Sequence, residues 1–214
     1  MADLSRFQHP RFARAYDRIS AESERRGTAG YRRRALAGLS GQVIEVGCGN
    51  GLNFAHYPET VAEVLAVEPE DRLRALAGQA AERAPVPVRM VAGHAGALPA
   101  ADGACDAAVT SLVLCSVSDV AGALAEIRRV LGPDGQLRFF EHVRSDKPWF
   151  GLLQDLVAPV WSRAGGGCQL NRDTASAITA AGFRIDRLDR FAFAPLRGVP
   201  AYAHVLGCAR VPRD

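Results

Sequence analysis

Apolar runs alternate with amphipathic patterns along most of the chain. Continuous apolar runs predict buried strands, whereas apolar residues spaced three and four positions apart predict helices. We therefore expect strands at residues 42–46, 62–68, 86–92, 105–114, 136–143, 183–191 and 201–211. We expect helices at residues 70–84, 119–131 and 172–182, and a helical N-terminal segment at residues 10–39 that is interrupted near residues 27–30.

Strands that alternate with helices of about 10–15 residues are typical of a mostly parallel, doubly wound α/β sheet. The 214 residues suit one such domain, with residues 1–40 as an N-terminal helical cap and residues 41–214 as the α/β domain. Residues 144–171 form an insertion with two tryptophans and a glycine-rich turn, and we expect it to be part of a lid. In such sheets ligands bind beyond the carboxyl ends of the strands.

The net charge of +3 is unevenly distributed along the chain. Residues 1–41 hold nine arginines against four acidic residues, a balance of +5 that leaves −2 for the remainder. One interpretation is a nucleic-acid-binding arm. We favour a solvated amphipathic helix, because Phe12, Ala15, Tyr16 and Ile19 follow helical spacing and indicate a face that packs.

The sequence predicts a cytoplasmic protein with reduced thiols. No run approaches the roughly 18 uncharged apolar residues of a membrane helix, and residues 1–12 lack a signal-peptide core. The five cysteines, at positions 48, 105, 115, 168 and 208, are odd in number and form no CxxC pair. This pattern argues against a disulfide framework and against a zinc site, so we expect no metal.

A glycine motif follows the first expected strand, in the stretch "VIEVGCGNGLNF". Gly47 and Gly49 allow a tight strand-to-helix turn whose backbone N–H groups can reach a ligand. The spacing is GxGxG, whereas a dinucleotide fingerprint reads GxGxxG. A glycine turn without a ligand is the alternative.

An acidic residue at the end of the second strand strengthens the case for a nucleotide-like ligand. Glu68 lies 21 residues after Gly47, where a carboxylate accepts hydrogen bonds from ribose hydroxyls. The following Pro69 offers an apolar face near an adenine. The alternative is an ordinary surface glutamate, since Glu70 and Asp71 lie beside it.

The segments "EVGCGNG", "VEPE", "GHAGALP" and "CDAAVTSLVLCSV…IRRVLGPDGQL" together resemble the class I S-adenosylmethionine-dependent methyltransferases, from residue 40 onward. "SLVLCSV", "FFEHV", "GCQLNRDT" and "AYAHVLGCA" resemble the group that contains the animal membrane-anchored thiol S-methyltransferases. More distantly, the chain is similar to quinone C-methyltransferases. The resemblance implies a Rossmann-like sheet of seven strands, mostly parallel, with an antiparallel last strand.

The resemblance also implies where S-adenosylmethionine lies. Gly47, Gly49 and Asn53 would face its methionine part, Glu45 its amino group, Glu68 its ribose, and His94 with Ala95 its adenine edge. The other expected cofactor contacts are Tyr16, Cys48, Pro69, Thr110 and Leu112.

The chain departs from the family pattern in two ways. The family usually has an acidic residue at the position of His94, which leaves the contact to the adenine amino group open. The hydrophobic anchor of the animal proteins is replaced by an arginine-rich helix, so we expect no stable membrane insertion.

Methyl transfer from a sulfonium is an in-line displacement, so the protein mainly positions the nucleophile and removes its proton where needed. His142, at the end of the fifth strand, is our candidate base, and a rim histidine bonded to the backbone is the alternative. Glu141 points to the opposite face of a regular strand. Thr110 and Ser111 offer hydroxyl groups to cofactor or substrate, or they cap the strand end.

The acceptor pocket is expected to be apolar. Cys115 is predicted to lie in its wall rather than to act as a nucleophile, since a displacement needs no covalent enzyme intermediate and cysteine is commonly buried. Trp149, Phe150, Trp161 and Leu170 are the other lining candidates, with core packing as the alternative. We expect Tyr16 and Asp17 to fold the N-terminal helix over the cofactor, with helix packing alone as the alternative for Tyr16.

The leading hypothesis is therefore a small-molecule methyltransferase with a thiol acceptor. Oxygen, nitrogen and carbon acceptors, such as a phenol, a quinone or a natural product, stay open. "TSLVL" stands where nucleic-acid and protein N-methyltransferases carry an Asn/Asp-Pro-Pro-aromatic motif, so we expect no nucleic-acid partner. A non-catalytic cofactor-binding protein is the alternative of another class, and a nicotinamide-dependent oxidoreductase is disfavoured by the glycine spacing. The sequence does not indicate the oligomeric state.

Overall fold

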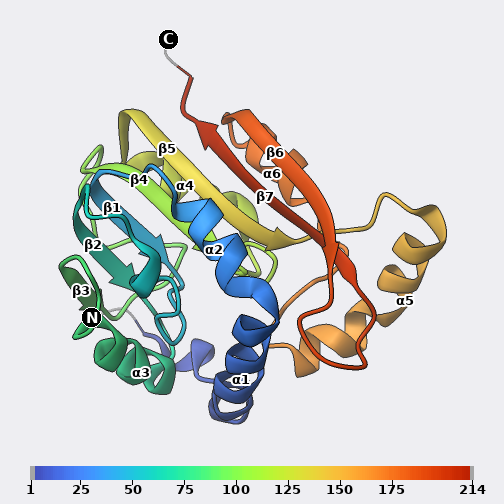
Figure 1. Cartoon of the computed structure of the whole chain (residues 1–214). Coiled ribbons are helices and arrows are strands. Elements are labelled where there is room, and N and C mark those ends of the chain that lie inside the picture. Colours follow the sequence, from blue (N-terminus) through green and yellow to red (C-terminus); the bar gives the residue numbers. More distant parts are fainter. Residues whose placement is uncertain (1–2, 213–214) are drawn as a thin grey trace.

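The computed structural model describes residues 3–212, which form a three-layer α/β structure around one seven-stranded sheet (Figure 1). The strand order is β3-β2-β1-β4-β5-β7-β6. The strands are β1 (Gly41–Val46), β2 (Val61–Val67), β3 (Val88–Val91), β4 (Cys105–Ser111), β5 (Leu131–His142), β6 (Arg184–Phe193) and β7 (Tyr202–Arg210). β1 to β5 pair in parallel, and β7 is antiparallel to both β5 and β6. The expected Rossmann-like sheet with an antiparallel last strand is confirmed.

Helices cover both faces of the sheet, because each face carries its own apolar core. On one face, α4 (Val120–Val130) and α6 (Thr174–Ala180) contribute buried residues such as Ile127 and Ile178. On the other face, α2 (Ala29–Leu36) and α3 (Asp71–Ala81) contribute Leu36 and Ala77. Asp119, Asp173 and Glu70 cap α4, α6 and α3 by accepting backbone N–H groups of the first turn.

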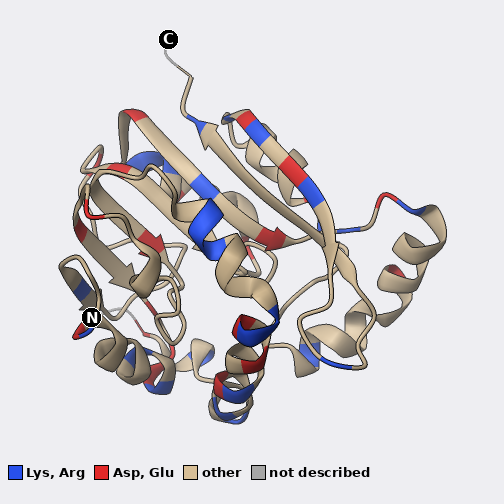
Figure 2. Cartoon of the chain, viewed as in Figure 1, with Lys and Arg blue, Asp and Glu red and all other residues tan. Residues whose placement is uncertain are grey.

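The N-terminal helical segment is interrupted where the sequence predicted. A 3₁₀ turn (Ser5–Phe7) precedes α1 (Pro10–Ser23), and a π-helical segment (Glu24–Thr28) leads into α2. The kink is at Gly27, whose φ of 124° is unfavourable for residues with a side chain. Both signs of charge lie along α1 (Figure 2), and Arg25 pairs with Glu22 at 2.7 Å.

The insertion after β5 contains a helix that the sequence analysis did not predict. α5 (Pro148–Ala164) stands at the edge of the domain, away from the sheet (Figure 1). Its apolar pattern has no clear period and Pro159 lies inside it, which hid it from a search for amphipathic helices. Gln154 is its main buried anchor, since its amide donates to the carbonyls of Val143 and Leu170. Several of its apolar residues are exposed, including Trp149, Leu152, Leu156 and Val160.

Two other boundaries differ from the expected ones. The helix predicted at residues 119–131 ends at Val130, and β5, predicted at residues 136–143, already begins at Leu131, which pairs with Cys105 before a register shift. Within residues 3–212 no helix combines the length and the apolarity needed to cross a bilayer.

Candidate active site

The site lies at the carboxyl ends of β1, β2, β4 and β5, where the loops that follow these strands converge. In a doubly wound sheet this edge is the usual place for a ligand. The strand order reverses between β1 and β4, which are neighbours in space although two strands separate them in the sequence. The glycine turn therefore follows β1 at the switch point itself.

The three glycines of the turn have different roles. Gly47, Gly49 and Gly51 have φ values of 66°, 58° and 81°, in the region that favours glycine. A Cβ on Gly47 would lie 2.8 Å from a Val113 methyl group, and one on Gly51 would lie 2.8 Å from the Phe54 ring. These two glycines are therefore required by packing.

Gly49 is the glycine that leaves room for a ligand. The three atoms nearest to a Cβ at this position all belong to Tyr16, and the closest is 3.4 Å away. The backbone N–H groups of the turn are engaged within the protein, contrary to expectation: those of Gly47 and Cys48 both donate to the carbonyl of Val67. The turn thus offers a ligand the open space at Gly49, whereas the N–H groups of Gly47 and Cys48 are not free to bind it.

Glu68 is a buried carboxylate oriented by the turn, and not a surface residue. It is 5% exposed, its Oε2 accepts the N–H of Gly49 at 2.8 Å, and its Oε1 accepts the N–H of Glu70 at 3.0 Å. Burial raises its pKa. An ionised carboxylate has about four lone-pair positions, so two remain to accept ribose hydroxyl groups. A carboxylate with free lone pairs beside an open glycine at this edge of the sheet can accept hydrogen bonds from the hydroxyl groups of a ribose.

Glu45 and Asn53 belong to a buried network behind the turn. The Asn53 amide donates to Glu45 Oε1 at 2.8 Å, and the Tyr57 hydroxyl donates to Glu45 Oε2 at 2.7 Å. Burial raises the pKa of Glu45 to about 7. The predicted contacts of Glu45 and Asn53 with the methionine part stay predictions, since both side chains are 1–2% exposed.

Arg32 joins this network and was missed by the sequence analysis. It is 5% exposed, donates to Glu24 at 2.8 Å and donates to Asn53 Oδ1 at 2.9 Å. The sequence placed it among nine arginines of a solvated helix, and no local signal separates it from Arg33 or Arg34.

The N-terminal residues lie over the glycine turn and over the predicted adenine side. Asn50 donates to Asp17 at 3.3 Å, which ties α1 to the turn. The Gln8 amide donates to the carbonyl of Pro69 at 2.8 Å. The Phe7 and His94 rings stack with their centroids 4.8 Å apart. These contacts join the N-terminal residues to the loops at this edge of the sheet, and Ala95 packs against the core beside His94.

The loop after β4 is strained and held by Glu141. Leu112 has a φ of 62° and is the one non-glycine residue with a positive φ within residues 3–212. The fully buried Glu141 carboxylate accepts the N–H groups of Val113, Leu114 and Cys115 at 3.0–3.2 Å. Glu141 therefore positions the loop, and its expected place on the opposite face of the strand from His142 stays a prediction.

Thr110 has a different position from the one expected of a catalytic residue. Its side chain is fully buried, and its hydroxyl finds no hydrogen bond of good geometry in the described part of the chain, although Glu141 is nearby. Ser111, the next residue, is partly exposed and accepts a hydrogen bond from Asn53 at 3.1 Å. We therefore assign Thr110 no contact with an acceptor.

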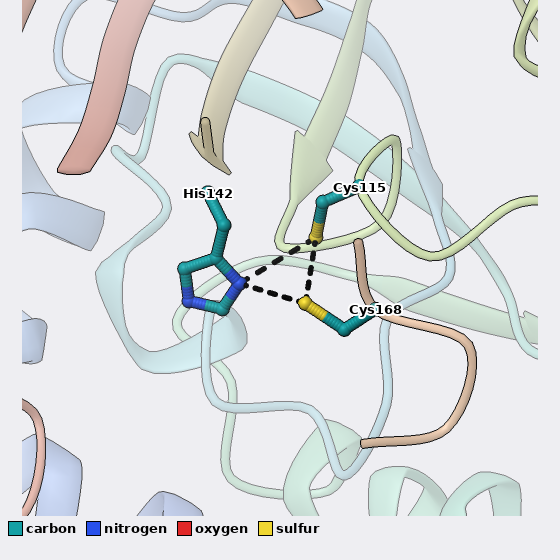
Figure 3. Close-up of side chains that lie close together, drawn as sticks. All are labelled: Cys115, His142 and Cys168. Carbon is teal, nitrogen blue, oxygen red and sulfur yellow. Dashed lines mark hydrogen bonds between the residues drawn. The ribbon is translucent and has the colours of Figure 1, made fainter. Parts of the chain in front are cut away.

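Cys115, His142 and Cys168 form a cluster at the ends of β4 and β5 (Figure 3). His142 Nδ1 lies 3.6 Å from Cys115 Sγ and 3.1 Å from Cys168 Sγ, and the two sulfurs are 3.7 Å apart. The hydrogen bond between the thiols raises the pKa of Cys115 and lowers that of Cys168, which His142 lowers further. Cys168 was not among the expected site residues.

The side chains around this cluster are mainly apolar and aromatic. Leu112, Phe150 and Leu170 pack against the two cysteines. Trp161 is 36% exposed and close enough to Cys168 to lower its pKa. Trp149 is 67% exposed and contacts the Phe150 ring with centroids 5.4 Å apart, so its expected place in the pocket lining stays a prediction.

The sequence brings Cys168 to this position through the glycine-rich turn of the insertion. Gly166 and Gly167 have φ values of 62° and 91°. A Cβ on Gly167 would lie 2.9 Å from the carbonyl oxygen of Ser116, so only glycine allows the two loops to approach this closely. The N–H of Gln169 then donates to the carbonyl of Cys115 at 2.8 Å.

Comparisons with known proteins identify the family and the fold. The model of a family described as "Methyltransferase domain" matches residues 44–139. The human proteins named thiol S-methyltransferase TMT1B and TMT1A are 35% and 34% identical to this chain over 182 and 180 residues. These alignments span 82% and 81% of this chain and 74% and 73% of theirs. A Thermotoga maritima structure described as an S-adenosylmethionine-dependent methyltransferase superposes with a TM-score of 0.71 at 21% identity, over 94% of this chain and 97% of the other.

Proposed function

The chain belongs to the S-adenosylmethionine-dependent methyltransferases, and from this premise we propose that it methylates the sulfur of a small-molecule thiol. The observation that carries the choice of acceptor is the likeness to two human thiol S-methyltransferases over about four-fifths of the chain. We further propose that it works in the cytoplasm, as suits a chain whose five cysteines are free thiols.

The residues of the turn support binding of the cofactor, which when bound supplies an electrophilic methyl group. Glu68 would hold the ribose, because its carboxylate is already oriented by the N–H groups of Gly49 and Glu70. Gly49 would allow close approach of the ligand to the backbone, with the Tyr16 ring covering the same space from α1. Phe7 and His94 would flank the adenine.

The cluster of Cys115, His142 and Cys168 supports a thiol acceptor. A free thiol with a pKa of about 8.5 is only a few per cent ionised at pH 7, so a group that takes its proton accelerates the transfer. We propose His142 as that group, because its Nδ1 lies beside the two cysteines and an imidazole nitrogen can accept a proton. The apolar residues around it, such as Leu112 and Phe150, suit a neutral thiol that ionises only after it binds.

The test is a panel of matched acceptors. The purified protein is incubated with S-adenosylmethionine and one acceptor at a time. The acceptors are aliphatic and aromatic thiols and, for comparison, alcohols, phenols, quinols and amines with the same carbon skeletons. Formation of S-adenosylhomocysteine and of the methylated product is then measured. Thiols are expected to react fastest. Faster methylation of a phenol, a quinol or an amine than of every thiol would reject the acceptor class.

A further inference from the structure

The three polar atoms of the cluster are spaced like the ligands of a zinc ion. Zn–S bonds of about 2.3 Å and Zn–N bonds of about 2.0 Å, arranged as a tetrahedron, place two sulfurs about 3.8 Å apart and a sulfur and a nitrogen about 3.5 Å apart. The observed separations are 3.7 Å between the sulfurs, and 3.6 and 3.1 Å from His142 Nδ1 to the sulfurs of Cys115 and Cys168. Only the last separation must lengthen, by about 0.4 Å.

We infer that Cys115 Sγ, His142 Nδ1 and Cys168 Sγ form a three-ligand site for Zn²⁺ whose fourth position binds the sulfur of the acceptor thiol. The second part of this inference rests on the proposed function. Two thiolates and an imidazole are a donor set that zinc prefers over the hard oxygen-binding cations. Three protein ligands with one open position are typical of catalytic zinc, whereas structural zinc has four protein ligands.

Each ligand is held in place by the fold before a metal binds. The Glu141 carboxylate accepts the N–H of Cys115 at 3.1 Å. His142 is paired with His204 across β5 and β7, and the two rings contact each other with centroids 4.8 Å apart. The glycine-rich turn fixes Cys168 against the Cys115 loop. These contacts hold the three side chains close to one another, so little rearrangement is needed for a metal to bind.

Of the polar groups beside the cluster, the Ser116 hydroxyl lies 3.6 Å from Cys115 Sγ, and a hydroxyl is not among the usual ligands of zinc. Two others are engaged elsewhere. Glu141 is occupied by three backbone N–H groups. His204 Nδ1 is bonded to the carbonyl of Tyr202 at 2.9 Å. Among residues 3–212 the cluster of potential ligands contains Cys115, His142 and Cys168 and no fourth member.

The reaction at such a site is balanced without an oxidant or a reductant. The acceptor thiol binds the metal and releases its proton to solvent, because a metal-bound thiol is deprotonated. A lone pair of its sulfur forms the new bond to the methyl carbon. The bond from that carbon to the sulfonium breaks, its electron pair stays on the sulfur of S-adenosylhomocysteine, and the neutral thioether leaves. The metal keeps its charge throughout.

The site escaped the sequence analysis because that search relied on closely spaced ligands. Cys115 and Cys168 are 53 residues apart, and His142 is 26 or 27 residues from each.

The two sulfurs would also be near enough to form a disulfide after a shift toward the bonded distance of about 2.05 Å. A disulfide would consume two ligands, so it and the metal site exclude each other.

The first experiment measures the metal. The full chain is purified under reducing conditions, stripped with a chelator and titrated with Zn²⁺ or Co²⁺. One metal per chain is expected, with the sulfur-to-cobalt charge-transfer band and the visible bands of tetrahedral Co²⁺. Cys115→Ser and Cys168→Ser should each lower the affinity by more than the 10–100-fold that loss of an outer contact costs. Cys208→Ser, a half-buried thiol on β7 outside the cluster, should bind as the parent does.

The second experiment separates this inference from the proposed function. Addition of a thiol to the Co²⁺ protein should strengthen the charge-transfer band, whereas the matching alcohol should not. Thiol methylation by a chelator-treated protein at the full rate would overturn the metal inference and leave the function standing. Tetrahedral Co²⁺ without any thiol methylation would reject the function and the acceptor position but keep the metal site. If the purified protein contained a Cys115–Cys168 disulfide, and if it still bound no Zn²⁺ or Co²⁺ after that disulfide was reduced, the metal site would be overturned.

Discussion

The N–H of Gly49 donates to Glu68 Oε2 at 2.8 Å, which links the glycine turn after β1 to the carboxylate at the end of β2. In the proposed cofactor site, Gly49 would shape the space for the ligand and Glu68 would offer the charged hydrogen-bond acceptor beside it. Because the second Glu68 oxygen is fixed by Glu70, the carboxylate cannot turn away when the ligand is absent.

Replacement of Glu68 should weaken cofactor binding. Glu68→Gln removes the charge from the hydrogen bonds to the ribose, which are worth about 1.5–3 kcal/mol, or roughly 10–150-fold in affinity. Calorimetric titration with S-adenosylhomocysteine measures the change. Glu59→Gln, at an exposed glutamate in the turn before β2, is the matched control and should bind normally. Equal affinity of the two variants would contradict the role of Glu68.

Gly49→Ala should lower cofactor affinity while the protein still folds. The added methyl group would occupy the space beside Tyr16. An alanine at the backbone φ of 58° found at this position also costs about 1–2 kcal/mol of strain. Gly51→Ala is the comparison, because its Cβ would clash with Phe54 and it should mainly lose stability. Thermal unfolding and calorimetry together distinguish the two. Normal binding by Gly49→Ala would show that no ligand packs against the turn.

The buried carboxyl of Glu45 should make stability depend on pH. Its pKa is raised from 4.5 to about 7, so the folded protein holds this proton up to pH 7, whereas the unfolded chain has already lost it. The stabilisation is full below pH 4.5 and is lost as the pH rises toward 7. Glu45→Gln removes this effect. The free energy of unfolding of the variant, taken relative to that of the parent, should therefore be on the order of 3 kcal/mol higher at pH 8 than at pH 4. Urea unfolding of both proteins at both pH values measures these free energies. If variant and parent differed by the same amount at pH 4 and at pH 8, the raised pKa of Glu45 would be contradicted.

The contribution of His142 should depend on how far the acceptor is ionised. A thiol of pKa 8.5 is about 3% ionised at pH 7 and about three-quarters ionised at pH 9. In metal-free protein His142→Ala should therefore lose much turnover at pH 7 and much less at pH 9. Equal losses at both pH values in metal-free protein would contradict a role of His142 as a base. Cofactor affinity, measured in parallel, should not change.

Gly167→Ala should disturb the acceptor side and spare the cofactor side. Its Cβ would lie 2.9 Å from the Ser116 carbonyl and would push Cys168 away from Cys115. Gly198→Ala has a similar positive φ of 79° with open space around the added atom, so it controls for backbone strain alone. We expect Gly167→Ala to lose Co²⁺ binding and thiol methylation, with normal calorimetry for the cofactor. Loss of both to the same degree in Gly198→Ala would show strain to be the cause.

Local pattern alone determined the order of strands and helices, the kink at Gly27 and the glycine turn. These features depend on neighbouring residues: the period of apolar positions, a residue without a Cβ, and an acidic residue at a strand end. Glu68 could be singled out for the same reason, because a fixed spacing joins it to Gly47 across one strand-and-helix unit. The helix α5 escaped this reasoning because Pro159 and its unperiodic apolar residues carry no clear local signal.

Tertiary structure alone decided which polar groups meet. Arg32 differs from its neighbours Arg33 and Arg34 only because the kink at Gly27 turns it toward Asn53 and Glu24. The three residues of the cluster come from segments that are far apart in the sequence, and nothing in the sequence indicates that the polar atoms of Cys115, His142 and Cys168 lie within 4 Å of one another. Sequence periodicity reports which side of an element is buried, but the contact between two distant elements depends on the packing of every element between them.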